Sequence, residues 1–170
     1  GQQQAGQILG RSIAQAGLRL IYGGGTKGIM GAVADGAMRG GGKVTGIIPR
    51  FLISKEATES ALDRLDQLIV TQNMHERKHR MFEESDAFVA LPGGIGTVEE
   101  IVEIMTWAQL GHHRKPIVFA NVDGFWNPML ELLDHMRAEG FIHTSHLVKP
   151  IVVAEPEQVV PTILVEAAAD

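Results

Sequence analysis

The densest group of residues that could do chemistry is the run Pro92-Gly93-Gly94-Ile95-Gly96-Thr97-Val98-Glu99-Glu100. It follows the apolar residues 87–91, which predict a strand, and a helical pattern begins near Thr97. A glycine loop between a strand and a helix can hold phosphate, because the backbone approaches the anion and the first helical N–H groups point at it. Phosphate would repel the Glu100 carboxylate, one turn into the helix, so we expect Glu100 to face another part of the ligand. The run indicates an enzyme acting on a phosphorylated small molecule.

Thr97 and Glu100 also have the spacing of a capping box, with threonine at the N-cap and glutamate three residues later. On that interpretation Glu100 is only a helix cap, and the spacing alone leaves both roles open. Glu99 points elsewhere and is expected at the surface. Thr106 lies further along the same helix, where its hydroxyl could reach a ligand or bond back to the helix.

A second glycine run, Gly23-Gly24-Gly25-Thr26-Lys27-Gly28, follows a predicted strand and precedes a predicted helix. Its G-x-G-x-x-G spacing is typical of a dinucleotide site. Such a site also needs an acidic residue at the end of the next strand, and that strand ends Ile47-Ile48-Pro49-Arg50. NAD is therefore disfavoured, and NADP would have to use Arg50. A tight turn with close helix–strand packing, or a phosphate or ribose contact, remains open.

The one dense cationic run in the sequence is His75-Glu76-Arg77-Lys78-His79-Arg80, in a helix predicted for residues 74–84. Such a run is usually a solvated helix face. Here methionines bracket it at helical spacing, so we expect one side of the helix to be packed. The run directly follows a predicted strand, which places its first turn at the rim where the glycine loops lie. Arg77 and Lys78 could then bind a phosphate or a carboxylate.

Predicted helices and strands alternate along the chain, which predicts one α/β domain with a parallel sheet covered on both faces. Ligands of such sheets bind at the carboxyl ends of the strands, where both glycine runs lie. The expected helices are residues 4–16, 29–38, 74–84, 97–110, 128–138 and 156–167, and the expected strands are residues 18–22, 44–48, 68–70, 87–91, 117–120 and 151–153.

Composition narrows the classes of function. The chain has 170 residues, 45% of them hydrophobic, and no apolar run reaches the about 20 residues of a membrane-spanning helix. The net charge of −5 disfavours a basic face for nucleic acid. Cysteine is absent, which excludes disulfides and thiolate chemistry and fits a cytoplasmic protein. His112-His113 and the pair His143 and His146 lack a carboxylate at metal-site spacing, so we expect no metal.

Three runs, in this order and spacing, resemble the Lonely Guy (LOG) family of cytokinin riboside 5′-monophosphate phosphoribohydrolases, which are often mislabelled as lysine decarboxylases. The runs are residues 23–31, 74–78 and 92–100. The resemblance implies a Rossmann-like homodimer that needs no cofactor and cleaves the N-glycosidic bond of a nucleoside 5′-monophosphate, such as AMP or its N6-isopentenyl derivative. The products would be the free base and ribose 5-phosphate. The helix at 97–110 is also apolar around more of its circumference than one sheet contact covers, which favours a dimer.

The resemblance also implies roles for single residues. Arg77 and Glu100 correspond to the catalytic pair. A family glutamate corresponds to Glu56 if three residues are inserted before the second run, and to Glu59 without that gap. The other substrate contacts that we expect are Gly24, Gly25, Met74, Lys78, Gly93, Gly94, Ile95, Gly96, Thr97 and Thr106.

The sequence departs from the family at both ends. Family members begin with a strand and a Cys-Gly-Ser-Ser-type loop that this sequence lacks. We expect that strand in the natural protein, because its loss would leave neighbouring strands unpaired. Residues after about 150 match no family motif. A decarboxylase is not supported, because nothing beyond Lys78 marks a Schiff-base lysine. Two rivals stay open: a nucleotide or molybdenum-cofactor binding protein of the same fold, and a nicotinamide-dependent oxidoreductase.

Overall fold

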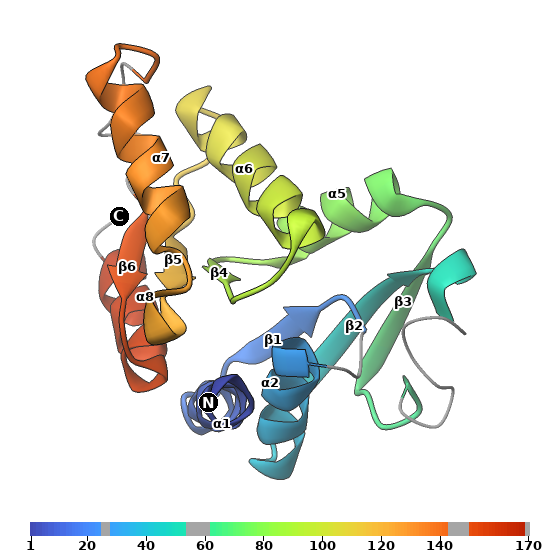
Figure 1. The fold of residues 1–170 in the computed structure, drawn as a ribbon. Helices are drawn as coiled ribbons and strands as arrows, with labels where there is room; N and C mark the ends of the chain where they lie inside the picture. Colours follow the sequence, from blue (N-terminus) through green and yellow to red (C-terminus); the bar gives the residue numbers. More distant parts are fainter. Residues whose placement is uncertain (25–27, 54–61, 143–149, 169–170) are drawn as a thin grey trace. The chain divides into compact units, whose positions relative to one another are not determined.

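The computed structural model describes residues 1–24, 28–53, 62–142 and 150–168. The chain folds into two compact units, Gly1–Asp86 and Ala87–Asp170 (Figure 1). Each unit contains three parallel strands with helices packed against them, so the predicted parallel α/β fold is confirmed. Within the described ranges, no helix is both long enough and apolar enough to cross a membrane.

The first unit is built on the parallel sheet β1-β2-β3. The strand β2 lies in the middle, and its residues after Lys43 are all buried, which suits an apolar strand with neighbours on both sides. Tyr22, the last residue of β1, pairs with Gly46 in the middle of β2, and β2 continues beside β3 to Pro49. The elements are α1 (Gln2–Gln15), β1 (Arg19–Tyr22), α2 (Gly28–Arg39), β2 (Lys43–Pro49), η1 (Arg50–Leu52), β3 (Gln67–Thr71) and α5 (Met74–Glu84).

Glycines let α1 and α2 pack backbone against backbone. A Cβ on Gly10 would lie 2.1 Å from the carbonyl oxygen of Val33, and one on Gly36 would lie 2.4 Å from that of Gln7. Any side chain at either position would push the helices apart. This close contact fixes the position of α2 against α1. The helix α2 is the one that follows the first glycine run.

The second unit is built on the parallel sheet β4-β5-β6. All four residues of β5 are buried between the two outer strands. The predicted helices and strands are all present, with ends that shift by a few residues. The elements are β4 (Phe88–Ala90), α6 (Ile95–Gln109), β5 (Ile117–Ala120), η2 (Val122–Gly124), α7 (Asn127–Ala138), β6 (Ile151–Val153), η3 (Pro156–Gln158) and α8 (Val159–Ala168).

The first strand of each unit lies at an edge of its sheet. Among the described residues, β1 pairs with β2 alone and β4 pairs with β5 alone. The expected strand upstream of Gly1 stays a prediction, and so does the organisation of the chain as one domain.

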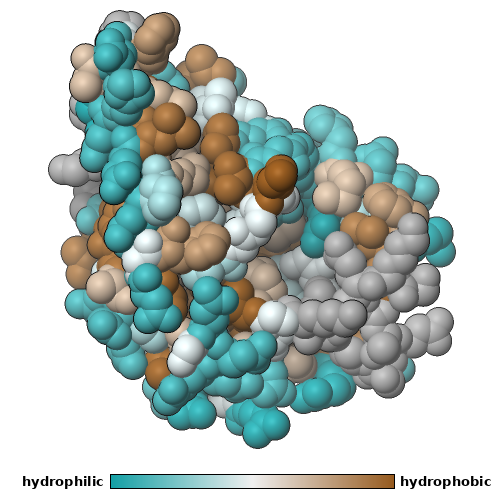
Figure 2. All heavy atoms as spheres, in the orientation of Figure 1, coloured by the Kyte–Doolittle hydropathy of each residue, from teal (hydrophilic) through white to brown (hydrophobic). Residues whose placement is uncertain are grey.

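Large apolar side chains reach the surface along α6. Figure 2 shows hydrophobic residues among hydrophilic ones where Figure 1 places this helix. Ile95 is 88% exposed, Val102 42% and Leu110, just after the helix, 67%. With about 100° of rotation per residue, the three lie within about 80° of one another around the helix axis, and Val102 lies about 60° from the buried Met105. The predicted apolar surplus on this helix is therefore present as an exposed stripe.

Candidate functional site

The helix α5 begins directly after β3 because Asn73 caps it. The Asn73 Oδ1 accepts a hydrogen bond of 2.8 Å from the Glu76 N–H, and the Glu76 carboxylate accepts one of 3.0 Å from the Gln72 N–H. These contacts satisfy N–H groups at the start of the helix. The sequence analysis missed this cap, although Asn followed three residues later by Glu is a recognised signal. The cap brings the predicted residues of the cationic run to the carboxyl end of the sheet.

Arg77 is buried, with 9% of its surface exposed. Its Nε donates a hydrogen bond of 3.1 Å to the Ile47 carbonyl, and its Nη2 donates one of 3.0 Å to the Gly23 carbonyl. Its Nη1 lies 3.8 Å from the sulfur of Met74. The guanidinium therefore joins the residue that follows β1 to the carboxyl half of β2. The interpretation of the cationic run as a solvated helix face fits His75 and His79, which are exposed. It is wrong for Arg77, which is buried. Lys78 is half-buried.

The first glycine run is only partly described. Gly24 has a φ of 80°, which an L side chain rarely adopts, so its backbone conformation favours glycine. Gly25, Thr26 and Lys27 lie outside the described residues, as do the two candidate glutamates, Glu56 and Glu59. The substrate contacts expected of Gly24, Gly25 and Glu56 therefore stay predictions.

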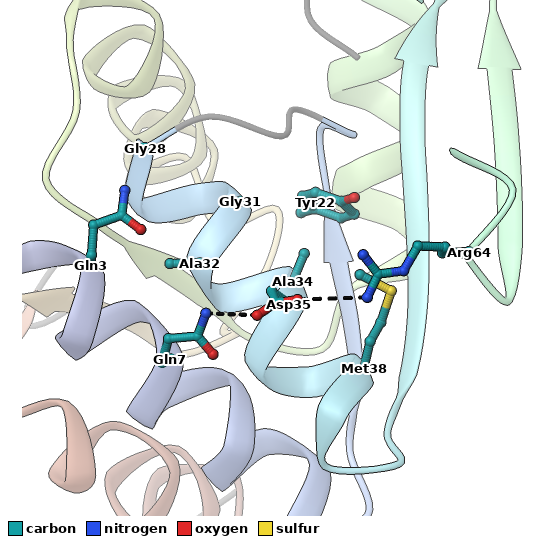
Figure 3. A pocket seen from close by; sticks show the side chains of 10 residues that line it. All are labelled: Gln3, Gln7, Tyr22, Gly28, Gly31, Ala32, Ala34, Asp35, Met38 and Arg64. Carbon is teal, nitrogen blue, oxygen red and sulfur yellow. Dashed lines mark hydrogen bonds and ion pairs between the residues drawn. The ribbon is translucent and has the colours of Figure 1, made fainter. Parts of the chain in front are cut away.

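A pocket of about 310 Å³ lies in the first unit beside α2, and Figure 3 shows its lining. Asp35 accepts a hydrogen bond of 2.8 Å from Gln7 of α1 and pairs with Arg39 at 2.8 Å and with Arg64 at 3.6 Å. The Gln7 hydrogen bond, aided by the two arginine charges, lowers the pKa of Asp35. Burial raises the pKa of Tyr22, which also lines the pocket. None of the predicted site residues that the structure describes lines this pocket, so we give it no role in the chemistry.

In the second unit the loop after β4 leads straight into α6. The helix begins at Ile95, its N-cap is Gly94, and no side chain caps it. The predicted capping box is therefore wrong, because Thr97 already lies inside the helix and Glu100 lies deeper still. A Cβ on Gly93 would lie 2.4 Å from the Thr97 hydroxyl oxygen, so Gly93 leaves room for that side chain. Gly93, Gly94, Ile95 and Gly96 are exposed, which leaves this loop open to an anion.

Glu100 is half-buried and Glu99 is exposed, as the sequence predicts for Glu99. The Thr106 hydroxyl donates a hydrogen bond of 2.9 Å to the Val102 carbonyl. Of the two roles that the sequence leaves open for Thr106, this is the bond back to the helix. Six residues separate Glu100 from Thr106, so their side chains point about 120° apart around α6. A substrate contact by Thr106 stays a prediction.

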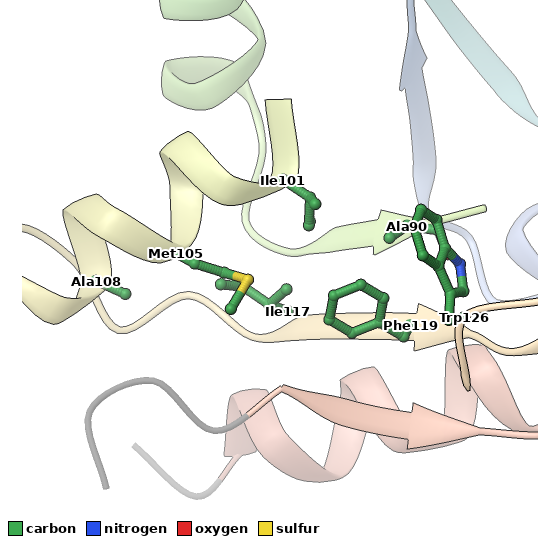
Figure 4. Close-up of a cluster of buried hydrophobic side chains, with 7 residues drawn as sticks. All are labelled: Ala90, Ile101, Met105, Ala108, Ile117, Phe119 and Trp126. Atoms are coloured by element: carbon green, nitrogen blue, oxygen red, sulfur yellow. The ribbon is translucent and has the colours of Figure 1, made fainter. Parts of the chain in front are cut away.

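The helix α6 and the loop before it rest on a well-packed core. Figure 4 shows Ile101 and Met105 of α6 beside Phe119 of β5 and the indole of Trp126. The indole Nε1 donates a buried hydrogen bond of 3.1 Å to the Ala90 carbonyl, two residues before Pro92. These contacts fix the end of β4 and hence the start of the glycine loop.

Each unit contains one group that could take part in a reaction. In the first unit this group is the Arg77 guanidinium, which hydrogen bonds fix to Gly23, after β1, and to Ile47 of β2. The second unit holds an open glycine loop followed by the half-buried carboxylate of Glu100. Arg77 and Glu100 thus lie in different units, and their pairing stays a prediction. Within the described parts of the chain no group of three or more metal-ligating side chains occurs, and His143 and His146 lie outside them.

Comparison with known proteins shows the family. A family model described as "Possible lysine decarboxylase" matches residues 30–163. A cytokinin riboside 5′-monophosphate phosphoribohydrolase of Oryza sativa subsp. japonica is 45% identical over 140 residues, 82% of this chain and 57% of that protein. One of Rhodococcoides fascians is 41% identical over 160 residues, 94% of this chain and 80% of that protein. The chain belongs to the LOG family of phosphoribohydrolases, as its three motifs predict.

The chain spans 57% to 64% of the length of the rice relatives that it matches. Solved structures agree on the fold. A molybdenum cofactor carrier protein of Chlamydomonas reinhardtii has a TM-score of 0.69 and 21% identity, and the match covers 98% of this chain and 88% of that chain. At this identity the likeness shows the fold alone.

Proposed function

We propose that the protein hydrolyses the N-glycosidic bond of nucleoside 5′-monophosphates, with AMP or an N6-modified AMP as substrate and a cytoplasmic location. The observation that carries the proposal is the open glycine loop that leads into α6, with the half-buried Glu100 further along the helix. Family membership supports the same reaction, since relatives with this name are 41% to 45% identical. The products are the free base and ribose 5-phosphate.

The loop N–H groups of residues 93–96 bind the 5′-phosphate and so orient the ribose. The bond between C1′ and the base nitrogen breaks with its electrons going to the base, which leaves a positive, oxocarbenium-like C1′. Glu100, ionised, stabilises this cation and accepts a proton from the water that attacks C1′. The departing base takes up a proton from solvent, and Glu100 returns its proton to solvent, which restores the carboxylate. Arg77 and Lys78 supply two positive charges for anionic oxygens of the substrate, and the backbone contacts of Arg77 fix the first of them. No step requires a metal.

The rival is a carrier that holds a phosphorylated ligand without chemistry. Its support is the fold likeness to molybdenum cofactor carrier proteins, which extends over nearly the whole chain. Glu100 favours the hydrolase, because a carboxylate beside a phosphate site weakens anion binding and is useful only if positive charge develops nearby.

We expect turnover of AMP and almost none of adenosine, because the phosphate supplies the binding energy that orients the sugar. Base release from both substrates is measured by chromatography. Lys78→Ala should weaken AMP turnover and leave the trace activity on adenosine unchanged. Comparable rates on AMP and adenosine would contradict the phosphate role of the loop, and full activity of the Arg77→Ala/Lys78→Ala double variant would contradict the charge role of these two residues.

We infer a homodimer through the exposed stripe on α6. Ile95, Val102 and Leu110 give it an apolar surface that is costly to leave in water, and the intervals of 7 and 8 residues between them are typical of a helix that packs on another helix. A second copy of the chain is the occupant, because the same stripe on two copies is self-complementary about a two-fold axis.

Light scattering at micromolar concentration is expected to give the mass of a dimer, and Val102→Asp the mass of a monomer, since a buried carboxylate opposes association. Leu132→Asp on α7 is the matched control, because Leu132 is 50% exposed but lies off the stripe. A monomeric mass for the wild-type protein would rule out the dimer, and a dimeric Val102→Asp variant would move the interface away from α6.

A further inference from the structure

Gly23 is a glycine with no room for a side chain, and the obstacle is Arg77. A Cβ built on Gly23 would lie 1.7 Å from Nη2 and 2.9 Å from Cζ of the guanidinium. Real Cβ atoms essentially never approach another heavy atom closer than 3.0 Å. By contrast, a Cβ on Gly94 or Gly96 of the other loop would meet nothing within 4 Å. Gly23 is the first glycine of the Gly23-Gly24-Gly25-Thr26-Lys27-Gly28 run. The space where its side chain would lie is filled by the guanidinium of Arg77.

The position of this cation is fixed by backbone groups. The carbonyls of Gly23 and Ile47 accept hydrogen bonds from two different nitrogens of the guanidinium, and both contacts are buried. Gly23 and Ile47 directly follow the paired residues Tyr22 and Gly46, so the guanidinium lies between the end of β1 and the carboxyl half of β2. Two hydrogen bonds from different nitrogens fix the orientation of this planar group.

We propose that Gly23 is a positioning residue for Arg77: it keeps open the space for the guanidinium, so that the first glycine of this run serves an arginine and not a phosphate. The inference rests on the proposed function, because Arg77 matters for turnover only if the protein is the hydrolase. In this position Arg77 supplies oriented N–H donors and charge to the substrate.

The test is a four-protein cycle of wild type, Gly23→Ala, Arg77→Ala and the double variant. Gly23→Ala must expel the guanidinium, so kcat should fall by roughly 10²-fold, as for a misplaced catalytic group. Its thermal midpoint should fall by about 5 °C or more, since two carbonyls lose their donor. The double variant should be no worse than Arg77→Ala alone, because the methyl then has room.

Additive losses in the double variant, or wild-type kcat and midpoint in Gly23→Ala, would overturn the proposal. If Gly23→Ala does not fold, a folded double variant supports the proposal, and an unfolded double variant beside a folded Arg77→Ala contradicts it. The thermal midpoints of the four proteins are measured without substrate, so they test the role of Gly23 even if the wild type releases no base. A wild type that releases no base would contradict the proposed function and leave the role of Gly23 to be judged from the midpoints.

Discussion

Glu100→Gln is expected to lower turnover of AMP by roughly 10²–10⁴-fold, the usual range for losing an acid–base group. This loss corresponds to about 3–5 kcal/mol of transition-state stabilisation. Glutamine keeps the size and shape of the side chain, and it removes the charge that would face the developing cation at C1′. Binding of AMP should survive, because the loop N–H groups are unchanged.

The structure sharpens this prediction. Glu100 is not part of a helix cap, since the N-cap of α6 is Gly94, so the substitution removes no capping interaction. We therefore expect a thermal midpoint within about 2 °C of the wild type. Glu99→Gln is the matched control, one residue away and exposed, and should keep turnover within about twofold. Near wild-type turnover of Glu100→Gln would exclude a catalytic role and favour the carrier.

Arg77→Ala is expected to affect both stability and turnover. The buried guanidinium satisfies two backbone carbonyls, so its removal should cost about 2–4 kcal/mol of the free energy of unfolding. For a chain of this length that corresponds to a fall of about 5–15 °C in the thermal midpoint. Turnover per folded molecule should fall as well, because the fixed charge beside the substrate is lost.

Arg80→Ala is the control, because Arg80 lies on the same helix, is partly exposed and pairs only with Glu84 at 3.5 Å among the described residues. Its free energy of unfolding should change by about 0.5 kcal/mol or less. An Arg77→Ala variant that unfolds at the wild-type temperature would contradict the contacts to Gly23 and Ile47. A destabilised variant with unchanged kcat would leave Arg77 a purely structural residue.

The order of helices and strands could be predicted from the sequence because apolar runs and glycines mark each end. The start of α6 could not. Thr97 and Glu100 imitate a cap, but the glycines before them let the helix begin at Ile95, and Gly94 becomes the N-cap. Local spacing cannot separate these two starts, since both satisfy the same helical pattern.

Motifs predicted the site residues but not their surroundings. The methionines that bracket the cationic run indicate a packed side of the helix, and Arg77 lies on that side while His75 and His79 stay exposed. Its partners Gly23 and Ile47 lie 54 and 30 residues away, and only the tertiary fold brings them together. The contacts of this buried charge are therefore beyond the reach of local sequence patterns.

Product analysis tests most directly whether this chain breaks a glycosidic bond. The purified protein is incubated with excess AMP, and adenine, ribose 5-phosphate, adenosine and remaining AMP are quantified together. We expect adenine and ribose 5-phosphate in equal amounts, many-fold above the amount of protein, with no adenosine. Recovery of intact AMP, bound or free, would contradict the proposed hydrolysis and leave a carrier of phosphorylated ligands.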